Sequence, residues 1–315
     1  MIKIDLITGF LGSGKTTFIK KYAKYWMERG KNIGILENDY GAVNVDMMLL
    51  QELSGDNCGL EMVAGGCDDE SHRRRFKTKL IALGMYGYDR VLIEPSGIFD
   101  VDEFFDVLYE SPLNNWYEIG NVIAIVDAKL EDHLSEQSEY MLASQIANAG
   151  NIILSKSQEA TEDEMAKTIA HLNQVMEQVQ CKRRLKDEIV CTDWSKFTKE
   201  DFEQIANCGY VSENYVKLSN DQRNPYTSLY YMNLHMSEQE LRSKVKAMMQ
   251  DCACGNIFRV KGFLKVDEEQ WLELNATRKN INIKPIEQGQ EVLIVIGENL
   301  AEDVIQSYME EKEEG

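Results

Sequence analysis

The residue pattern with the clearest chemistry is a glycine-rich segment near the start of the chain. It reads Gly9-Phe10-Leu11-Gly12-Ser13-Gly14-Lys15-Thr16-Thr17, which fits the spacing G-x-x-x-x-G-K-S/T. Glycines let the backbone fold tightly, so that its N–H groups can point at phosphate. Lys15 would supply charge to the outer phosphates, and the Thr16 hydroxyl can ligate Mg²⁺. The segment therefore predicts a P-loop that binds the triphosphate of a nucleotide.

Two acidic segments could complete such a site. Residues 90–97 are an apolar run that ends at Glu94, with Gly97 three positions on. P-loop enzymes place a carboxylate here to hold Mg²⁺, and a backbone amide near the γ-phosphate. Residues 36–46 lie where a switch segment would follow the second strand, and Asp39 could orient the attacking water or complete the Mg²⁺ shell. The alternative for this second segment is a polar loop that uses Asn and Gly for its turns.

Together these segments resemble the CobW-like metallochaperone GTPases, within the SIMIBI class of P-loop NTPases. Beyond the P-loop, the resemblance rests on Asn38-Asp39-Tyr40-Gly41 with Asp46, on Glu94-Pro95-Ser96-Gly97, on Val126-Asp127-Ala128 and on Arg259-Val260-Lys261-Gly262-Phe263. It implies GTP hydrolysis that is coupled to delivering or sensing a divalent metal, for a cobalamin, nickel or zinc client.

The metal motif of that family is altered in this chain. The family carries Gly-Cys-x-Cys-Cys, and the corresponding stretch here is Gly66-Cys67-Asp68-Asp69-Glu70. Four residues could still bind a metal: Cys67, Asp69, Glu70 and His72. One thiolate with two carboxylates and an imidazole would favour Zn, Co, Ni or Fe over Cu(I). The alternative is that the metal site is lost and the acidic residues cap a helix that begins there.

The motif that reads the base is also altered. The family resembles other GTPases in carrying Asn-Lys-x-Asp, and the aligned residues here are Leu154-Ser155-Lys156-Ser157-Gln158. An aspartate at the last position accepts two hydrogen bonds from guanine, whereas Gln158 offers one amide oxygen and adds two donors. Lys156 can still cover the face of the ring. We expect Ser155, Lys156 and Gln158 to contact the base, with GTP preferred by resemblance and ATP left open.

Composition restricts the partners and the compartment. The net charge is −19, which argues against nucleic acid or a membrane surface as a general partner. The first residues are too few and too charged for a signal peptide, and no apolar run reaches the ~20 residues of a membrane span. The seven cysteines are an odd number and are scattered, as in a chain with reduced thiols. We therefore expect a cytoplasmic protein. Cys252-Ala253-Cys254 could chelate a metal or could be buried thiols at a helix end.

The elements that must position these residues follow two patterns. In the first part of the chain, apolar runs alternate with helical stretches, which predicts an α/β P-loop domain with a mainly parallel sheet over residues 1–210. Its expected strands are residues 2–7, 32–36, 90–93, 122–126 and 152–154, and its expected helices are residues 16–29, 101–109, 134–148 and 162–180. After a polar linker at about 209–227, strands follow one another. This change predicts a smaller α+β C-terminal domain over residues 225–315.

The sequence thus predicts a Mg²⁺-dependent nucleoside triphosphatase in which Lys15, Asp39 and Glu94 act in catalysis, with Thr16 and Glu94 as Mg²⁺ ligands. Its expected task is to deliver Zn²⁺, Co²⁺ or Ni²⁺ to a metalloenzyme or corrinoid protein, or to assist that client's maturation. We expect a monomer or a weak, nucleotide-dependent dimer. Two alternatives stay open: a nucleotide-gated assembly factor without a transferable metal of its own, and a small-molecule P-loop kinase or ATPase.

Overall fold

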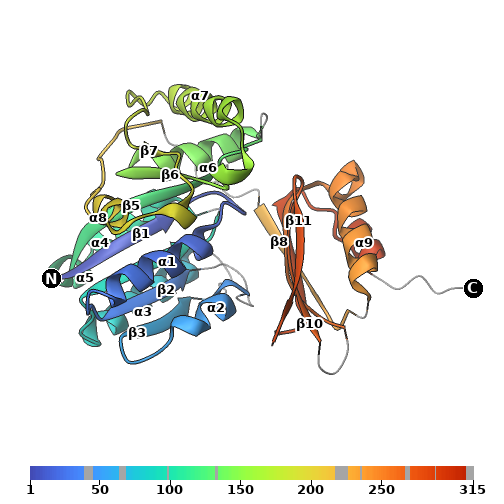
Figure 1. Ribbon diagram of the computed structural model, residues 1–315, viewed down its shortest axis with the longest axis horizontal. Coiled ribbons are helices and arrows are strands. Elements are labelled where there is room, and N and C mark those ends of the chain that lie inside the picture. Colours follow the sequence, from blue (N-terminus) through green and yellow to red (C-terminus); the bar gives the residue numbers. More distant parts are fainter. Residues whose placement is uncertain are drawn as a thin grey trace, which may run out of the picture. The chain divides into compact units, whose positions relative to one another are not determined.

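The computed structural model describes residues 1–38, 45–63, 69–97, 99–131, 134–216, 226–234, 236–266, 270–287 and 289–309, with the backbone alone at Val45 and Asp69. The chain divides into two compact units, Met1–Arg223 and Asn224–Gly315 (Figure 1). Each unit has its own sheet and its own core. No helix among the described residues combines the length and the apolar character that a bilayer span requires.

The first unit is built on a parallel sheet. Among the described residues seven strands pair in the order β3-β2-β4-β1-β5-β6-β7, and every pairing is parallel. The strands are β1 (Ile2–Thr8), β2 (Ile33–Asn38), β3 (Cys58–Val63), β4 (Arg90–Pro95), β5 (Tyr117–Asp127), β6 (Asn151–Ser155) and β7 (Ile189–Val190). This arrangement confirms the predicted α/β class. Parallel strands run in one direction, so the residues that follow β1, β4, β5 and β6 meet at one edge of the sheet.

Helices cover both faces of this sheet (Figure 1). One face packs against α1 (Lys15–Met27) and α8 (Lys199–Ile205), and its core includes Phe18 and Tyr22. The other face packs against α3 (Asp69–Met85), α4 (Val101–Tyr109), α6 (Glu136–Ala147) and α7 (Glu162–Gln178). Side chains of β1 serve both cores, since Ile4 and Leu6 point to one face and Ile7 to the other. Shorter helices are α2 (Val45–Leu50) and α5 (Leu113–Trp116).

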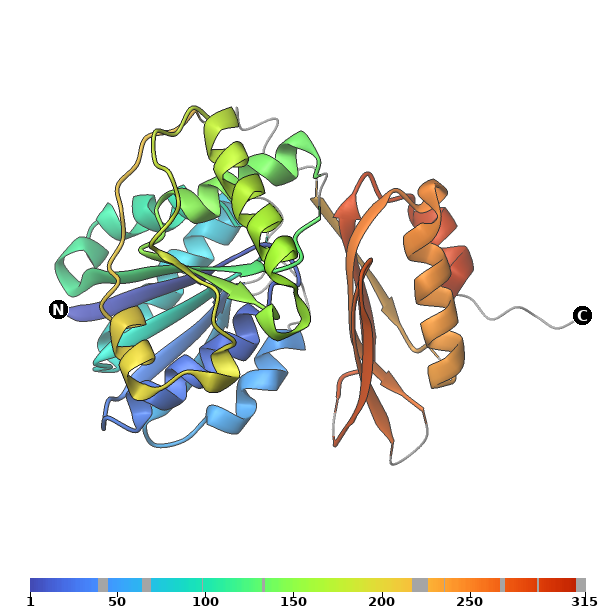
Figure 2. The same cartoon turned by 45° about the horizontal axis from the view of Figure 1, so that its top comes forward.

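The second unit is an antiparallel sheet with helices on one face. The described strands pair in the order β11-β10-β9-β12-β8, and each pairing is antiparallel. They are β8 (Tyr226–Met232), β9 (Asn256–Lys265), β10 (Trp271–Thr277), β11 (Ile281–Ile286) and β12 (Val292–Glu298). Figure 2 shows α9 (Glu238–Gln250) and α10 (Glu302–Met309) on one side of this sheet, and Leu241, Val245 and Ile305 enter the core there. The predicted α+β class of this unit is confirmed.

Candidate nucleotide and cation site

The P-loop connects the end of β1 to the start of α1. Its glycines have positive φ angles of 144° at Gly9, 74° at Gly12 and 96° at Gly14, a region of backbone space that favours glycine. A Cβ atom on Gly9 would also lie 2.1 Å from the carbonyl oxygen of Ile125. Helix α1 begins at Lys15 with no side-chain cap, so its first N–H groups lie at the loop without an intrahelical partner. These amides and the helix dipole favour an anion at this point.

Two side chains of the first turn of α1 are held by neighbouring oxygens. Lys15 is 6% exposed, and its Nζ donates a hydrogen bond of 2.9 Å to the Gly9 carbonyl. The Thr16 hydroxyl donates a hydrogen bond of 2.7 Å to Oε1 of Glu94, at the end of β4. Thr17 is exposed. The structure therefore brings Lys15, Thr16 and Glu94 together, although they are distant in the sequence.

Buried hydroxyl groups also lie at the loop. Ser13 is 2% exposed and Ser155, at the end of β6, is 1% exposed. Neither Oγ atom has a hydrogen-bond partner among the residues that the structure describes. Buried polar groups are normally paired, so these two hydroxyls fit a site whose polar partner is a bound ligand. A ligand rich in hydrogen-bond acceptors, such as a phosphate chain, could accept a hydrogen bond from each hydroxyl.

Carboxylates gather behind the loop. Glu94 is 2% exposed, and Glu37 on β2 lies beside it in the sheet register. Burial raises the pKa of Glu94 to about 7, and the nearby charge of Asp46 on α2 raises it as well. Lys15 and the hydrogen bond from Thr16 lower it. Sequence reasoning did not predict Glu37 here; its position one residue before the end of β2 was the available signal.

This donor set fits Mg²⁺. That ion prefers oxygen ligands, and proteins usually hold it through one or two carboxylates together with substrate phosphates. The Thr16 hydroxyl and the Glu94 carboxylate are such oxygens, and they lie next to the loop. Within the described ranges no three His, Cys, Asp or Glu side chains are arranged to hold a metal ion by themselves. The protein's contribution to a Mg²⁺ site here would therefore be small, as it is where the nucleotide supplies the other ligands.

The segment after β4 packs against the P-loop. A Cβ atom on Gly97 would lie 2.7 Å from the backbone nitrogen of Leu11, so only glycine allows this approach. The Gln145 amide donates a hydrogen bond of 2.9 Å to the Gly97 carbonyl and fixes the segment from α6. Asp39, the expected water-positioning residue, lies outside the described residues, and its role stays a prediction.

Lys156 connects the predicted base-binding segment to the P-loop. Its Nζ donates hydrogen bonds of 2.6 Å to Oδ2 of Asp127 and 3.3 Å to the Gly12 carbonyl. Its backbone is left-handed, with φ of 56°, at the start of the 3₁₀ helix η2 (Ser157–Glu159). Gln158 is exposed on η2. The P-loop and the Val126-Asp127-Ala128 segment, which both carry the family resemblance, therefore meet the altered base motif at Lys156.

An aromatic residue that sequence reasoning missed closes one side of the loop. Trp194 begins the 3₁₀ helix η3 (Trp194–Lys196), and a Cβ atom on Gly14 would lie 3.0 Å from its ring. The ring also packs on Phe18 of α1, with 6.0 Å between centroids. The only signal in the sequence was a tryptophan in an otherwise polar segment after the last strand. That signal is weak, because such a residue can equally belong to the core.

The residues of the altered metal motif are only partly described. Cys67 and the side chain of Asp69 lie outside the described part of the chain. Glu70 is exposed on α3 and forms an ion pair with Arg74 one turn on, whereas His72 is fully buried. Residues two apart on a helix do not face each other. The structure thus does not bring Glu70 and His72 together, and the proposed ligand set remains a prediction.

The Cys-x-Cys pair of the second unit is split between surface and core. Cys254 is fully buried, whereas Cys252 is exposed, and both belong to the 3₁₀ helix η5 (Cys252–Cys254). The description as two buried thiols is therefore right for Cys254 and wrong for Cys252, because only the last position of η5 faces the sheet. The described cysteines are free thiols.

A parallel sheet with a glycine loop between β1 and α1, and with a lysine, a threonine and a carboxylate at that loop, defines a P-loop nucleotide-binding fold. Residues 3–185 match the family model of the CobW/HypB/UreG nucleotide-binding domain. Residues 234–312 match the C-terminal domain of the cobalamin synthesis protein cobW. The chain belongs to the CobW/HypB/UreG family, which confirms the resemblance drawn from its motifs.

The curated relatives match about half of the chain by sequence. The zinc chaperone YjiA of Escherichia coli K12 is 31% identical over 183 residues, 55% of this chain and 55% of its own length. The zinc chaperone YeiR of the same organism is 32% identical over 162 residues, 51% of this chain and 48% of its own length. The chain thus spans about half the length of the curated relatives it matches. A crystal structure of Zn(II)-bound YjiA GTPase covers 98% of this chain and 99% of that chain at 18% identity, with a TM-score of 0.36.

Proposed function

We propose that this protein is a Mg²⁺-dependent nucleoside triphosphatase that prefers GTP to ATP. The observation that carries the proposal is the contact of 2.7 Å between Thr16 and the buried Glu94, directly behind the P-loop. Hydrolysis of a nucleoside triphosphate depends on positioning and on charge stabilisation, and a hydroxyl and a carboxylate at this point are the usual protein ligands of the ion. The name of a curated relative, the zinc-regulated GTPase metalloprotein activator 1 of Schizosaccharomyces pombe, supports the preference for GTP.

The residues of the site would have different roles in binding and hydrolysis. Lys15 and the loop amides would bind the phosphates, and Gly97 would present its backbone amide near the terminal one. Thr16 and Glu94 would hold Mg²⁺, Glu94 directly or through a water, and the ion would neutralise charge on the outer phosphates. Because a nearby cation favours the ionised carboxylate, binding would lower the pKa of Glu94 from about 7. Asp39, or a neighbouring switch residue, would position the attacking water.

Contacts of the base would come from the segment after β6. Lys156 would cover the ring, and Ser155 and Gln158 would lie at its edge. Gln158 is exposed and makes no hydrogen bond with the described residues, so its amide is available to a ligand. One amide oxygen satisfies guanine less well than a carboxylate, so we propose a weaker selection of GTP over ATP than an aspartate would give.

Phosphate release from GTP and from ATP tests this proposal. With Mg²⁺, Lys15→Ala should lower the rate by about 100-fold or more, because the loss of a charge at the transferring phosphate is costly. Lys24→Ala, on the same helix but paired at the surface with Glu52, is the matched control and should keep the rate. Equal rates in the two variants would reject the P-loop as the site of hydrolysis. Phosphate transfer to a small acceptor in place of release would favour the kinase alternative.

We further propose that nucleotide hydrolysis is coupled to the delivery of Zn²⁺, Co²⁺ or Ni²⁺ to a metalloenzyme or corrinoid client, or to its maturation. The names of YjiA and YeiR as zinc chaperones support this proposal. The metal would bind Cys67 with Asp69, Glu70 or His72. A nucleotide-gated assembly factor without its own transferable metal is the alternative.

Metal titration separates these two functions. The intact chain and a Cys67→Ala/Glu70→Ala variant would be titrated with Zn²⁺, Co²⁺ and Ni²⁺, with elemental analysis of the bound ion. The delivery function predicts that the variant loses one equivalent of bound metal. Cys252→Ala is the comparison, because its thiol is exposed in the other unit. Unchanged binding in the Cys67 variant would reject a metal site at that loop.

A further inference from the structure

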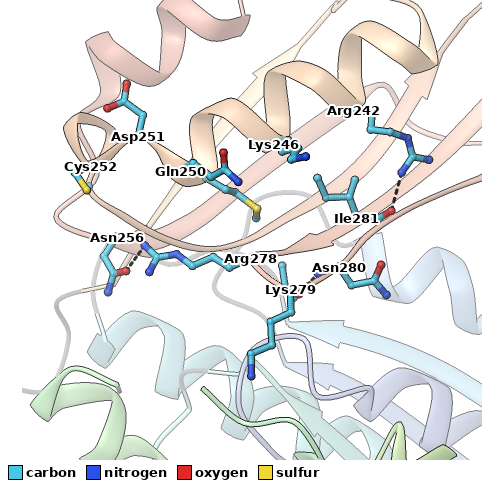
Figure 3. A pocket seen from close by; sticks show the side chains of 13 residues that line it. Arg242, Lys246, Gln250, Asp251, Cys252, Asn256, Arg278, Lys279, Asn280 and Ile281 are labelled. Carbon is cyan, nitrogen blue, oxygen red and sulfur yellow. Dashed lines mark hydrogen bonds between the residues drawn. The ribbon is translucent and has the colours of Figure 1, made fainter. Parts of the chain in front are cut away.

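The second unit contains a cavity that the nucleotide site does not use. It has a volume of about 810 Å³ and lies between α9, the η5 segment and the turn that joins β10 to β11 (Figure 3). Ligand pockets for small molecules commonly measure about 300–1,000 Å³. The cavity is therefore large enough to take a small organic molecule.

The charge of the lining is opposite to that of the protein. Four basic side chains and one acidic side chain line the cavity: Arg242, Lys246, Arg278, Lys279 and Asp251. The whole chain has a net charge of −19, and residues 224–315 contain 10 Lys and Arg against 16 Asp and Glu. Four of these ten cations thus line one cavity of an acidic unit. A concave surface lined by charges of one sign concentrates counter-ions of the other sign.

The acidic side chain of the lining, Asp251, forms hydrogen bonds with groups other than the four basic side chains. Asp251 accepts hydrogen bonds of 2.9 Å from the Ala253 amide and 2.8 Å from the Tyr308 hydroxyl. These bonds, the one from the Ala253 amide first, hold the pKa of Asp251 below its usual value. Asp251 therefore caps η5 and does not form an ion pair with the basic residues opposite.

Neutral oxygen acceptors hold the two arginine side chains of the lining. Arg278 donates a hydrogen bond of 2.6 Å to Oδ1 of Asn256, and Arg242 donates one of 2.9 Å to the Ile281 carbonyl. Arg242 also contacts Glu238 at the surface, at 3.2 Å. In the described part of the chain, neither Lys246 nor Arg278 forms an ion pair. Two cations thus lack a carboxylate partner among the described residues, and a bound anion would supply one.

The cations come from two sides. Figure 3 shows Arg242 and Lys246 on α9, across the cavity from Arg278 on the β10–β11 turn. That turn is closed by two backbone hydrogen bonds between Thr277 and Asn280, of 2.8 and 3.2 Å. Arginine presents a planar fork of donors that matches phosphate and carboxylate oxygens. A ligand that satisfies both sides needs at least two anionic groups.

We propose that this cavity binds a small organic polyanion that carries two or more phosphate or carboxylate groups. One group would bind at Arg242 and Lys246 and another at Arg278, with the body of the molecule between α9 and the turn. The site belongs to the second unit alone, so it does not depend on the proposed nucleoside triphosphatase activity.

The exposed thiol of Cys252 lines the cavity and can report on its charge. Iodoacetate is an anion and iodoacetamide is neutral, and the thiolate attacks either reagent and displaces iodide. The rate of alkylation by iodoacetate is divided by the rate with iodoacetamide. This ratio cancels the thiolate fraction and reports the local potential. Cys191, exposed in the first unit, is the internal control in the same protein. At low salt the ratio at Cys252 should exceed that at Cys191 by about threefold or more, and added salt should reduce the difference. Equal ratios would overturn the proposal.

Ligand protection of the same thiol is the decisive test. Pyrophosphate and citrate are the probes, and the alkylation of each cysteine by iodoacetamide in the full chain is followed by peptide mass spectrometry. We expect at least one probe to slow alkylation at Cys252 severalfold and to leave Cys191 unchanged. The probe that protects Cys252 at the lower concentration identifies phosphate or carboxylate as the preferred group. In Lys15→Ala, which disables the P-loop, protection of Cys252 should persist, so failure of the nucleotide site would not be mistaken for failure of this one.

Two variants complete the test. Lys246→Gln/Arg278→Gln removes one cation from each side and should abolish the protection. Lys284→Gln, which lies on β11 and pairs with Glu273 outside the lining, should retain it. The proposal is overturned if neither probe protects Cys252 up to about 10 mM, a concentration at which specific binding would be evident. It is also overturned if protection persists in the double variant, or if a polyglutamate peptide protects at lower concentration than both probes, since that would indicate a surface for acidic chains.

Discussion

Glu94 places a carboxylate inside the protein next to a second carboxylate, Asp46. Burial raises the pKa of Glu94 to about 7, whereas an unfolded chain would give a value of about 4.3. Folding therefore favours the protonated form of this residue between those two values. Glu94 must be ionised to bind Mg²⁺. Without the ion, its carboxyl group is only partly ionised near pH 7.

This residue predicts a pH dependence of stability. With EDTA and without nucleotide, the stability that protonated Glu94 contributes is fully present below about pH 4 and is lost as the pH rises through about 7. Glu94→Gln keeps the shape and removes the titration, so its free energy of unfolding should fall less between pH 5 and pH 8. Urea unfolding across that range measures the difference. Glu203→Gln, exposed on α8, should behave like the unsubstituted protein, and an identical pH slope in Glu94→Gln would contradict the prediction.

Gln158 carries the prediction about the base. Gln158→Asp should raise the affinity for GTP by about 10-fold or more and leave that for ATP unchanged, because a carboxylate accepts two hydrogen bonds from guanine. Glu159→Gln, the exposed neighbour on η2, is the control. Equilibrium binding of both nucleotides measures the effect. If the unsubstituted protein already prefers GTP by several orders of magnitude, the interpretation of Gln158 as a weak contact is wrong.

At the scale of single residues, the sequence predicted the features that depend on neighbouring positions in the chain. The P-loop is one continuous motif whose glycine conformations and lysine follow from adjacent positions, so its geometry could be read from nine residues. The approach of Trp194 to Gly14, and of Asp46 to Glu94, depends on how distant segments pack. No spacing rule encodes such contacts, which is why sequence reasoning missed Trp194.

Among the elements, β1 is fixed by a buried charge at the middle of the strand. Asp5 is fully buried and accepts hydrogen bonds of 2.5 Å from Arg90 on β4, 2.8 Å from the Tyr22 hydroxyl on α1 and 2.9 Å from the Asn121 amide on β5. Burial raises the pKa of Asp5, and Arg90 opposes that rise. The guanidinium also lies 4.0 Å from the Trp26 ring centroid. One residue thus connects three strands and a helix.

Removing one partner of this pair should be costly. Arg90→Met leaves the Asp5 carboxylate buried without its cation, which costs about 3–5 kcal/mol. Asp5→Asn/Arg90→Met removes both charges and should recover part of that loss. Lys3→Met breaks an exposed pair with Glu118 in the same strands and should cost less than about 1 kcal/mol. Urea unfolding measures all three. A similar cost for Arg90→Met and Lys3→Met would show that Asp5 is not held by its ion pair.

Helices and strands were predicted correctly where the sequence contains a clear local pattern, such as a helix cap or apolar residues at regular spacing. The predicted limits of α4 are the observed ones, because Asp100 caps the helix and its apolar residues recur at helical spacing. Strand β3 was missed, because it lies at the sheet edge and its residues are mostly half-buried. Strand β5 begins at Tyr117, five residues before the predicted start. Its polar first half pairs with β1, and Asn121 in this half donates a hydrogen bond to Asp5. These contacts extend the strand, and no local sequence pattern predicts them.

On the scale of the whole molecule, the change of pattern along the chain was sufficient to predict two fold classes. Alternation of strands and helices requires a covered parallel sheet, and successive strands require an antiparallel one. What the patterns could not give is the charge distribution. The basic cavity of the second unit is assembled from α9, η5 and a turn, and the strands β9 and β10 separate the first two from the turn in the sequence.

Because each unit has its own core, nucleotide binding should stabilise them differently. GDP with Mg²⁺ at about 100 times its dissociation constant would stabilise the first unit by about 2.7 kcal/mol, which slows exchange of its most protected amides by about 100-fold. Amides of β9 and β12, in the core of the second unit, should keep their exchange rates. Hydrogen exchange with mass spectrometry on the full chain measures both. Lys15→Ala should abolish the effect on β1, β4 and β5. Slower exchange throughout β9 and β12 would show instead that the two cores unfold as one.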